Sequence, residues 1–367
     1  MIVNPQNFKI KTNTILKGNA LEVLKTLPDN FIDCVMTSPP YYDLRDYGSG
    51  AISTWGGSEI CNHEWVKNQE SGFCVKCGAW RGQLGLEPSC EMYVQHLTQI
   101  FAEVKRVLKK SGSLWLNIGD TYFTNHENLG FKGILTSEDD VYNQKCLMGI
   151  PWRVAFALIK NGWILRNAVI WHKPNHMPAS VKDRLANTYE YIFHFVKAQK
   201  YYNLDAIRLP HKTTPKEKIQ QNGGKSKYKL PDPSAEKFNH TDALRKNGYH
   251  EEGKNPGDFW AVNTRPYFDE HFAVFPPELC IMPILATCPP DGIVMDTFAG
   301  SGTTLSVAKV LGRKYVGIEI EDKYIELAEE RLKRLERPLA QINKLKDAEK
   351  AVKRIFMGDV NGMDFIA

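Results

Sequence analysis

The stretch that decides the fold is residues 294–304, which read VMDTFAGSGTT. It joins a short apolar strand, a tight turn containing Gly300 and Gly302, and the start of a helix. Glycines in such a turn let backbone N–H groups approach a ligand closely at the positive end of the helix. The next strand ends in Glu319, about 20 residues after the turn, the spacing at which an acid binds ribose hydroxyls in nucleotide-type folds. The stretch therefore predicts an α/β fold that binds a nucleoside-containing ligand at this turn.

The turn differs from the fingerprint of dinucleotide-binding proteins. Leu305 stands where that fingerprint has its third glycine, and the Gly-Lys-Ser/Thr of a P-loop does not follow the turn. A turn shortened in this way fits a ligand without a pyrophosphate, such as S-adenosylmethionine. Asp296, just before the turn, is suited to hold the amino group of a methionine moiety. A tight turn with no ligand is the alternative, and Asp296 weighs against it.

Alternating strand and helix patterns extend to both sides of this turn. Short apolar runs predict strands, and apolar residues at helical spacing predict helices. This alternation favours a mostly parallel twisted sheet with helices between its strands. The predicted strands are residues 12–16, 31–36, 113–118, 163–171, 189–196, 292–296 and 314–320. The predicted helices are 20–27, 91–109, 151–160, one that follows the glycine turn and runs through Val310, and 322–335, with a further helix in the charged tail up to Arg354.

A second motif, TSPPYY at residues 37–42, follows a buried strand, which places it at the carboxyl edge of such a sheet. Pro39 and Pro40 fix the backbone and leave carbonyls that only accept hydrogen bonds. Methyl transfer to an exocyclic amine needs acceptors that direct the nitrogen lone pair, which is delocalised into the base. The Ser38 hydroxyl and the Pro39 carbonyl are candidate acceptors, and Tyr41 offers a face for stacking an extruded base. A rigid proline turn is the alternative.

In this order the motifs resemble those of the amino-group DNA methyltransferases of the permuted (β-class) type, in which the catalytic loop precedes the cofactor turn. Residues 37–41 match the catalytic motif, residues 296–304 the cofactor motif, and residues 317–319 the segment with the ribose-binding acid. The segments WHKPN at 171–175 and HFAVFP at 271–276 resemble two further segments of the family. The resemblance covers residues 12–200 and 258–335.

The resemblance implies a Rossmann-like, S-adenosylmethionine-dependent fold that transfers methyl to cytosine N4 or adenine N6 of a flipped base in double-stranded DNA. A serine at the start of the motif is associated mainly with cytosine N4, so Ser38 favours cytosine. Cytosine C5 chemistry is disfavoured, because it needs a thiolate, usually in a Pro-Cys pair, and no cysteine follows a proline here. Asn19 stands where the family commonly has an acid that holds the adenine amine, and its oxygen can still accept that bond. The implied catalytic residues are Ser38, Pro39, Pro40 and Tyr41, and the implied cofactor-binding residues are Asn19, Asp296, Phe298, Gly300, Gly302, Thr303 and Glu319.

A cluster of metal-binding residue types lies between the first strands. Cys61, His63, Cys74 and Cys77 offer four soft or borderline ligands, and the Cys-x-x-Cys-Gly half is typical of a zinc knuckle. The spacing predicts a structural Zn²⁺ with no open position for catalysis. Unliganded thiols, or Cys90 in place of one ligand, are the alternatives. The other cysteines are expected in the core, namely Cys34, Cys146, Cys280 and Cys288.

The positive charge is concentrated in one segment. The chain of 367 residues has a formal net charge of +5, and residues 197–258 hold 13 basic and 8 acidic residues, which accounts for the whole surplus. Interleaved aromatic residues suit phosphate contacts with occasional stacking, and the permuted family places its target-recognition region here. A solvated loop is the alternative. An RNA substrate stays open, because a basic lobe does not distinguish the two polymers.

These patterns divide the chain into four parts. We predict a catalytic part at residues 1–197 with the zinc-binding insertion at 56–90, a target-recognition region at 198–258, a cofactor-binding part at 259–337 and a tail at 338–367. No apolar run is long enough to span a membrane and the start lacks a signal-peptide pattern, so we expect a cytoplasmic protein, bacterial, archaeal or phage-encoded.

Several alternatives stay open at this stage. A homodimer and a cognate restriction endonuclease are open as partners. A catalytically inactive, zinc-containing DNA-binding scaffold is a rival reading of the same motifs. An NAD-dependent oxidoreductase is a second rival, which Leu305 disfavours.

Overall fold

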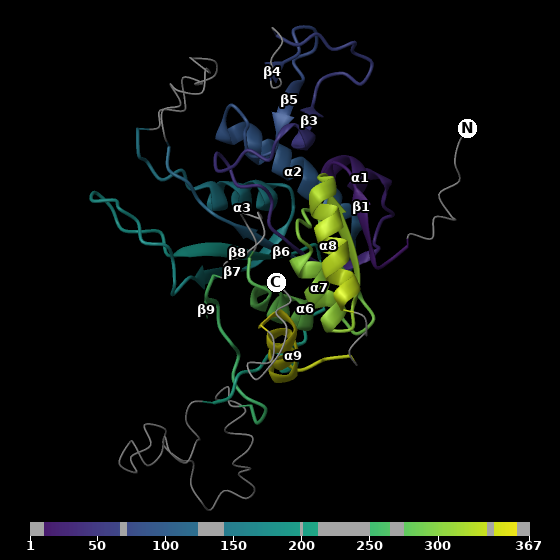
Figure 1. The fold of residues 1–367 in the computed structure, drawn as a ribbon, viewed down its shortest axis with the longest axis vertical. Coiled ribbons are helices and arrows are strands. Elements are labelled where there is room, and N and C mark those ends of the chain that lie inside the picture. Colours follow the sequence, from purple (N-terminus) through teal and green to yellow (C-terminus); the bar gives the residue numbers. More distant parts are fainter. Residues whose placement is uncertain are drawn as a thin grey trace, which may run out of the picture.

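The computed structural model describes residues 11–66, 72–123, 143–198, 201–211, 250–264, 275–335 and 341–357. An eight-stranded sheet in the order β1-β11-β10-β2-β6-β8-β7-β9 organises these residues (Figure 1). In chain order its strands are β1 Thr14–Lys17, β2 Ile32–Thr37, β6 Leu108–Ile118, β7 Ile164–His172, β8 Tyr189–Val196, β9 Phe259–Ala261, β10 Ile293–Asp296 and β11 Lys314–Glu319.

The sheet is mostly parallel, as predicted. All neighbours from β1 to β6 in the sheet order are parallel, and β8 alone runs antiparallel to both of its neighbours, β6 and β7. The late strands β10 and β11 lie between the early strands β1 and β2. The segments predicted as catalytic and cofactor-binding parts therefore share one sheet.

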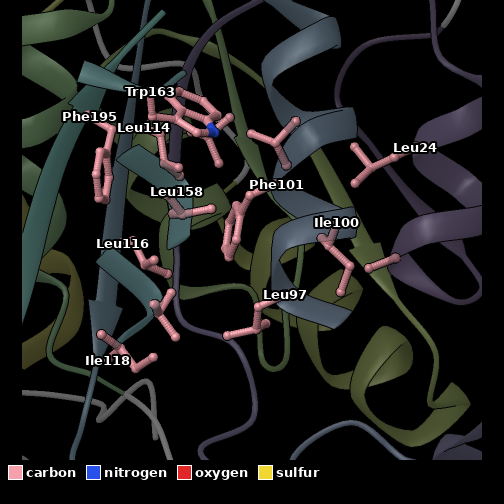
Figure 2. Packing of buried hydrophobic residues seen from close by; sticks show 14 of the residues in the cluster. Leu24, Leu97, Ile100, Phe101, Leu114, Leu116, Ile118, Leu158, Trp163 and Phe195 are labelled. Atoms are coloured by element: carbon pink, nitrogen blue, oxygen red, sulfur yellow. The ribbon is translucent and has the colours of Figure 1, made fainter. Parts of the chain in front are cut away.

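Helices cover both faces of this sheet. One face carries α1 Ala20–Thr26, α2 Cys90–Val107 and α3 Ile150–Lys160, and the other carries α6 Glu278–Thr287, α7 Thr303–Val310, α8 Asp322–Arg334 and α9 Leu345–Met357. From Cys34 to Met36 the side chains of β2 alternate between the two cores, as expected for a strand, whereas Ile32 lies beyond an irregularity in the register. Figure 2 shows the first core, in which Leu97 and Phe101 of α2 point toward β6. No helix among the described residues is long and apolar enough to cross a membrane.

Helix α6 was not predicted. It is apolar on nearly every side and contains Pro283, so it shows neither helical periodicity nor the usual composition of a helix. Contacts with β2, α7 and α9 bury it and override the local preference of its sequence.

A small second sheet lies beside α2, at the end of the molecule opposite α9 (Figure 1). Its strands are β3 Ile52–Trp55, β4 Gly72–Phe73 and β5 Trp80–Gln83, in the antiparallel order β3-β5-β4. It starts earlier than the predicted insertion at 56–90, directly after the short 3-10 turn η2 Ser49–Ala51. A second such turn is η4 Leu204–Ala206.

Three of the four cysteines expected in the core are there. Cys34, Cys280 and Cys288 are buried, whereas the prediction for Cys146 is wrong, because its side chain is exposed. Cys146 lies in an irregular segment before α3 and not in a strand or helix, so no neighbouring layer covers it.

Candidate active site and metal cluster

The two motif loops meet at one edge of the sheet. Strands β2 and β10 are parallel neighbours, so the loops that follow them leave from the same side. The Thr37 hydroxyl donates to Asp296 Oδ1 at 2.7 Å and thereby ties the two loops together. A cavity of about 1060 Å³, including its open mouth, lies beside them, and its lining includes Gly18, Asn19, Ser38, Pro40, Arg45, Asp46, Tyr47, Trp55, Phe298, Gly300, Glu319, Glu321 and Tyr324.

The two glycines of the turn have different roles. Gly300 lines the cavity and its N–H donates to Glu319 Oε2 at 2.8 Å. Gly302 is the N-cap residue of α7 with a φ of 75°. A Cβ at Gly302 would lie 2.9 Å from the Cβ of Ala328 in α8. Gly302 is therefore needed for the left-handed backbone and for close packing of α8.

Glu319 lies on the cavity surface at the end of β11, where the ribose-binding acid is predicted. Besides the bond from Gly300, its Oε1 accepts the N–H groups of Ile320 and Glu321 at 2.9 and 3.0 Å. Burial raises the pKa of this carboxyl group, while the backbone N–H groups act in the opposite direction. Glu319 thus holds the glycine turn against β11 and also lines the cavity.

Asp296 and Thr303 lie behind the cavity wall. Asp296 is 2% exposed and also accepts the N–H of Phe298 at 3.1 Å. Burial raises the pKa of Asp296 to about 7. The Thr303 hydroxyl accepts a hydrogen bond from Arg331 at 3.1 Å. Both residues build the turn, and their predicted contacts with the cofactor stay predictions.

Asn19 lines the cavity as the N-cap residue of α1. Its Oδ1 accepts the N–H of Leu21 at 2.9 Å and that of Glu22 at 3.4 Å, and its Nδ2 donates to the Ser53 hydroxyl at 2.8 Å. The oxygen predicted to accept the adenine amine is therefore already engaged in helix capping.

Three charged residues of the cavity lining were not predicted, namely Arg45, Asp46 and Glu321. Arg45 Nη1 and Glu321 Oε1 are buried and have no hydrogen-bond partner among the described residues. Buried polar atoms normally have partners, so these two atoms are available to a ligand. No sequence motif marks them, although Arg45 follows the catalytic loop and Glu321 follows Glu319 by two residues.

The catalytic loop is held from both sides. The hydroxyl of Tyr93, a fully buried residue of α2, donates to the Pro40 carbonyl at 2.7 Å. The ring of Tyr41 lies against Gly119, where an added Cβ would come within 2.6 Å of it. Ser38 and Pro40 line the cavity, while Pro39 is buried beneath it.

A chain of hydrogen bonds runs from Ser38 away from the cavity. The Ser38 hydroxyl donates to the Tyr41 oxygen at 3.2 Å, and the Tyr41 hydroxyl donates to Glu190 Oε2 at 2.7 Å. Glu190 also accepts from Asn117 Nδ2 at 3.0 Å and pairs with the ammonium group of Lys173. Glu190 and Asn117 were not predicted.

The charge at the end of this chain sets its direction. A carboxylate paired with an ammonium group only accepts hydrogen bonds, so Tyr41 donates to Glu190 and Ser38 donates to Tyr41. The lone pairs of Ser38 Oγ then remain free to accept from a group in the cavity. Burial and the negative charge of Glu190 raise the pKa of Tyr41, which keeps its proton in this chain.

Comparison with known proteins identifies the family. The sequence profile of the family described as DNA methylase matches residues 32–330. The chain belongs to this DNA methylase family. It is 36% identical over 343 residues to the Type II methyltransferase M.XycI of Xanthomonas campestris pv. cyanopsidis, which covers 90% of this chain and 91% of that protein. It is 35% identical over 335 residues to the Type II methyltransferase M.SmaI of Serratia marcescens, which covers 89% and 92%.

The fold agrees with this assignment. The solved structure of the PvuII DNA methyltransferase, named as cytosine-N4-specific, matches this DNA methylase with a TM-score of 0.54 over 96% of each chain at 18% identity. The identification from sequence as an amino-group DNA methyltransferase with a Rossmann-like fold is therefore confirmed.

The DNA methylase also brings its four predicted metal ligands together. The ligand atoms of Cys61, His63, Cys74 and Cys77 all lie within 4.8 Å of one another. Cys90 is not part of this group, because it begins α2 and packs in the core.

Most of the basic segment lies outside the described residues. Of the predicted target-recognition region, the structure describes residues 198, 201–211 and 250–258. Residues 271–274 of the HFAVFP segment also lie outside the described residues. The recognition region therefore stays a prediction.

Proposed function

We propose that this DNA methylase transfers a methyl group from S-adenosylmethionine to N4 of a flipped cytosine in double-stranded DNA. The observation that carries the proposal is the directed hydrogen-bond chain from Ser38 to Glu190. It leaves an acceptor oxygen at the cavity surface, in the loop that follows β2.

Ser38 is suited to activate an exocyclic amine. The amine nitrogen of cytosine is a poor nucleophile, because its lone pair is delocalised into the ring. Accepting its two N–H bonds, one at Ser38 Oγ and one at the Pro39 carbonyl, orients the group and directs the lone pair out of the ring plane toward the methyl donor. The new N–C bond would form as the C–S bond breaks, the electron pair of that bond would stay on sulfur as a neutral thioether, and the amine would release one proton to water.

The cavity fits S-adenosylmethionine in the chemistry of its walls. Bound there, this cofactor supplies an electrophilic methyl group on a sulfonium. Phe298, Trp55 and Tyr47 offer apolar and aromatic surface for an adenine ring. Arg45 Nη1, which no group in the described residues bonds, suits the carboxylate of the methionine moiety. The carboxylates of Glu319 and Glu321 suit ribose hydroxyls or an ammonium group.

Two further parts belong to the proposal. The basic residues of 197–258 contact DNA phosphates, which the charge surplus of that segment supports. A structural Zn²⁺ binds Cys61, His63, Cys74 and Cys77, and four protein ligands leave no position at which the metal could act in methyl transfer.

Mass spectrometry of nucleosides tests the function directly. DNA and RNA are isolated from cells that express the wild type or the Ser38→Ala variant and are digested to nucleosides. We expect N4-methylcytosine in wild-type DNA alone. N6-methyladenine in its place would overturn the choice of base, a methylated RNA nucleoside would overturn the choice of polymer, and equal methylation by Ser38→Ala would overturn the role of Ser38.

A further inference from the structure

We infer that the Zn²⁺ bound by Cys61, His63, Cys74 and Cys77 fixes one wall of the cofactor cavity, so that metal loading and cofactor affinity are coupled. The inference rests on the proposed cofactor and the proposed metal. A metal with no position open for catalysis would then still determine how tightly the active site binds its cofactor.

The four ligand atoms fit a tetrahedral metal site. Cys61 Sγ lies 3.9 Å from Cys74 Sγ, and His63 Nδ1 lies 3.3 Å from Cys77 Sγ. Bond lengths of 2.0–2.3 Å around Zn²⁺ give ligand-to-ligand distances of about 3.5–3.8 Å in a tetrahedron. Three thiolates and one imidazole are a donor set that selects Zn²⁺ among the divalent metals of cells.

The backbone around the cluster supports the same arrangement. The N–H of Glu64 points at Cys74 Sγ at 3.4 Å, as expected for a bond that stabilises a thiolate ligand. Gly78 has a φ of 73° and its N–H bonds the Cys74 carbonyl at 2.9 Å, which closes the turn between the last two ligands. A Cβ at Gly57 would lie 2.8 Å from Cys77 Sγ, so the chain passes very close to the cluster.

The ligands sit at the connections of the small sheet. Cys61 and His63 lie between β3 and β4, and Cys74 and Cys77 lie between β4 and β5. The three strands are of four, two and four residues. Strands this short bury little apolar surface, so a metal that links both connections supplies stability that the strands lack.

This small sheet builds the cavity wall through three direct links. Trp55, at the metal end of β3, lines the cavity and stacks on His96 of α2 with ring centres 4.4 Å apart. The Ser53 hydroxyl of β3 accepts the hydrogen bond from Asn19, which lines the cavity at the start of α1.

The third link is the side chain of Gln83 in β5. Its Nε2 donates to Asp46 Oδ1 at 2.7 Å and to the Gly48 carbonyl at 2.9 Å, and its Oε1 accepts the N–H of Tyr47 at 2.8 Å. Gln83 is 8% exposed, so its own end of these bonds is shielded from water, although Asp46 and Gly48 are exposed. They fix the segment that contains Arg45, Asp46 and Tyr47, three residues of the cavity lining.

Loss of the metal should therefore weaken cofactor binding without touching any cofactor contact. If the wall is formed only part of the time in the metal-free protein, the apparent dissociation constant rises in inverse proportion to that fraction. Coupling between two sites in one protein is typically 5- to 150-fold in affinity. We expect a loss within this range.

The test measures metal content and cofactor affinity on the same full-length protein. Elemental analysis of the purified wild type should give about one zinc per chain. Calorimetric titration with S-adenosylmethionine should show at least about 5-fold weaker binding after chelation, with recovery when one equivalent of zinc is returned. Cys77→Ser should behave like the chelated protein, and Cys146→Ser, which removes an exposed thiol outside the cluster, should behave like the wild type.

A second variant guards against general unfolding of the metal-free protein. Gln83→Ala keeps all four metal ligands but cuts the link to residues 46–48, so it should retain zinc and still bind S-adenosylmethionine more weakly than the wild type. Protein without zinc after expression in zinc-supplemented medium would overturn the metal site. Unchanged affinity after zinc removal or in Gln83→Ala would overturn the coupling. Zinc-loaded wild type that does not bind S-adenosylmethionine would contradict the proposed cofactor instead.

Discussion

The hydrogen-bond chain from Ser38 through Tyr41 to Glu190 predicts that Ser38 and Tyr41 act as one unit. Ser38→Ala removes the acceptor for the base amine. Tyr41→Phe keeps the ring but removes the hydroxyl. That hydroxyl accepts a hydrogen bond from Ser38 at 3.2 Å and donates one to Glu190 at 2.7 Å. In that variant Ser38 keeps its oxygen but loses the partner that orients its lone pairs.

The expected magnitudes follow from these contacts. Loss of a hydrogen-bonding group that acts directly on the reacting atoms costs about 100-fold in kcat, or about 2.7 kcal/mol. Loss of one neutral hydrogen bond that only positions such a group costs about 1.4 kcal/mol, or about 10-fold. If Tyr41 acts only through Ser38, the double variant loses about 100-fold, the same as Ser38→Ala alone.

The assay is transfer of labelled methyl from S-adenosylmethionine to DNA at saturating concentrations of both. Tyr122→Phe is the matched control, because it removes another tyrosine hydroxyl that donates to a side-chain oxygen, here Asn187 Oδ1 at 3.0 Å. It should retain wild-type kcat. If kcat of the double variant falls about 1,000-fold, the product of the two single effects, the two residues act independently. That result would refute the conclusion that Tyr41 acts through Ser38.

Three further outcomes follow from the structure. Burial raises the pKa of Asp296 to about 7, so the folded protein keeps a proton there that the unfolded chain releases near pH 4. The contribution of this group to the free energy of unfolding is therefore full below about pH 4 and is lost as the pH rises from about 4 through 7. Urea titrations should show that the free energy of unfolding falls by about 2–3 kcal/mol between pH 5 and pH 7 in the wild type but not in Asp296→Asn. The same dependence on pH in both proteins would contradict this expectation. Arg45→Gln should weaken S-adenosylmethionine binding in calorimetry by about 10-fold, whereas Arg166→Gln on the exposed side of β7 should leave it unchanged; equal affinities would remove Arg45 from the cofactor site. Replacing three lysines of the basic segment by glutamine should reduce the slope of log K for DNA against log salt by up to about 2.7. The tested residues are Lys225, Lys227 and Lys229, and the control residues, whose replacement should leave the slope unchanged, are the exposed Lys346, Lys350 and Lys353 of α9.

Most strands were predictable because each is a compact apolar run with clear ends. The strand over residues 189–196 was predicted with the bounds that β8 has, and β2 was predicted within one residue. Strand β6 starts at Leu108, five residues before the predicted start. Its first residues include lysines and a glycine, which hide the strand. Ile32 of β2 pairs with Leu108, and after an irregularity at residues 109–112 the regular pairing continues from Cys34 and Ser113.

The site was predictable where its residues share one short segment, and not where it depends on pairing between strands. The loop at residues 37–42 and the turn at 296–304 are each continuous in sequence. Glu190 and Asn117 meet because β8 and β6 are antiparallel neighbours, a pairing that no local pattern reveals. The one sequence signal for Glu190 is a charge inside an otherwise aromatic and apolar strand.

The motif residues and the cavity charges divide the work of cofactor binding between them. Asp296 accepts a hydrogen bond from Thr37, and Glu319 accepts one from Gly300. These bonds hold the turn in shape and occupy acceptor positions of both carboxylates. The two buried atoms that have no hydrogen-bond partner in the described part of the chain, Arg45 Nη1 and Glu321 Oε1, belong to residues outside the motifs. A buried polar atom without a partner costs about 1–3 kcal/mol, and more when charged, so a ligand that satisfies both atoms recovers this cost on binding. The turn can therefore stay rigid in the free protein while the neighbouring charges supply affinity, which is why the recognised motifs locate the cofactor site but do not by themselves determine how tightly it binds.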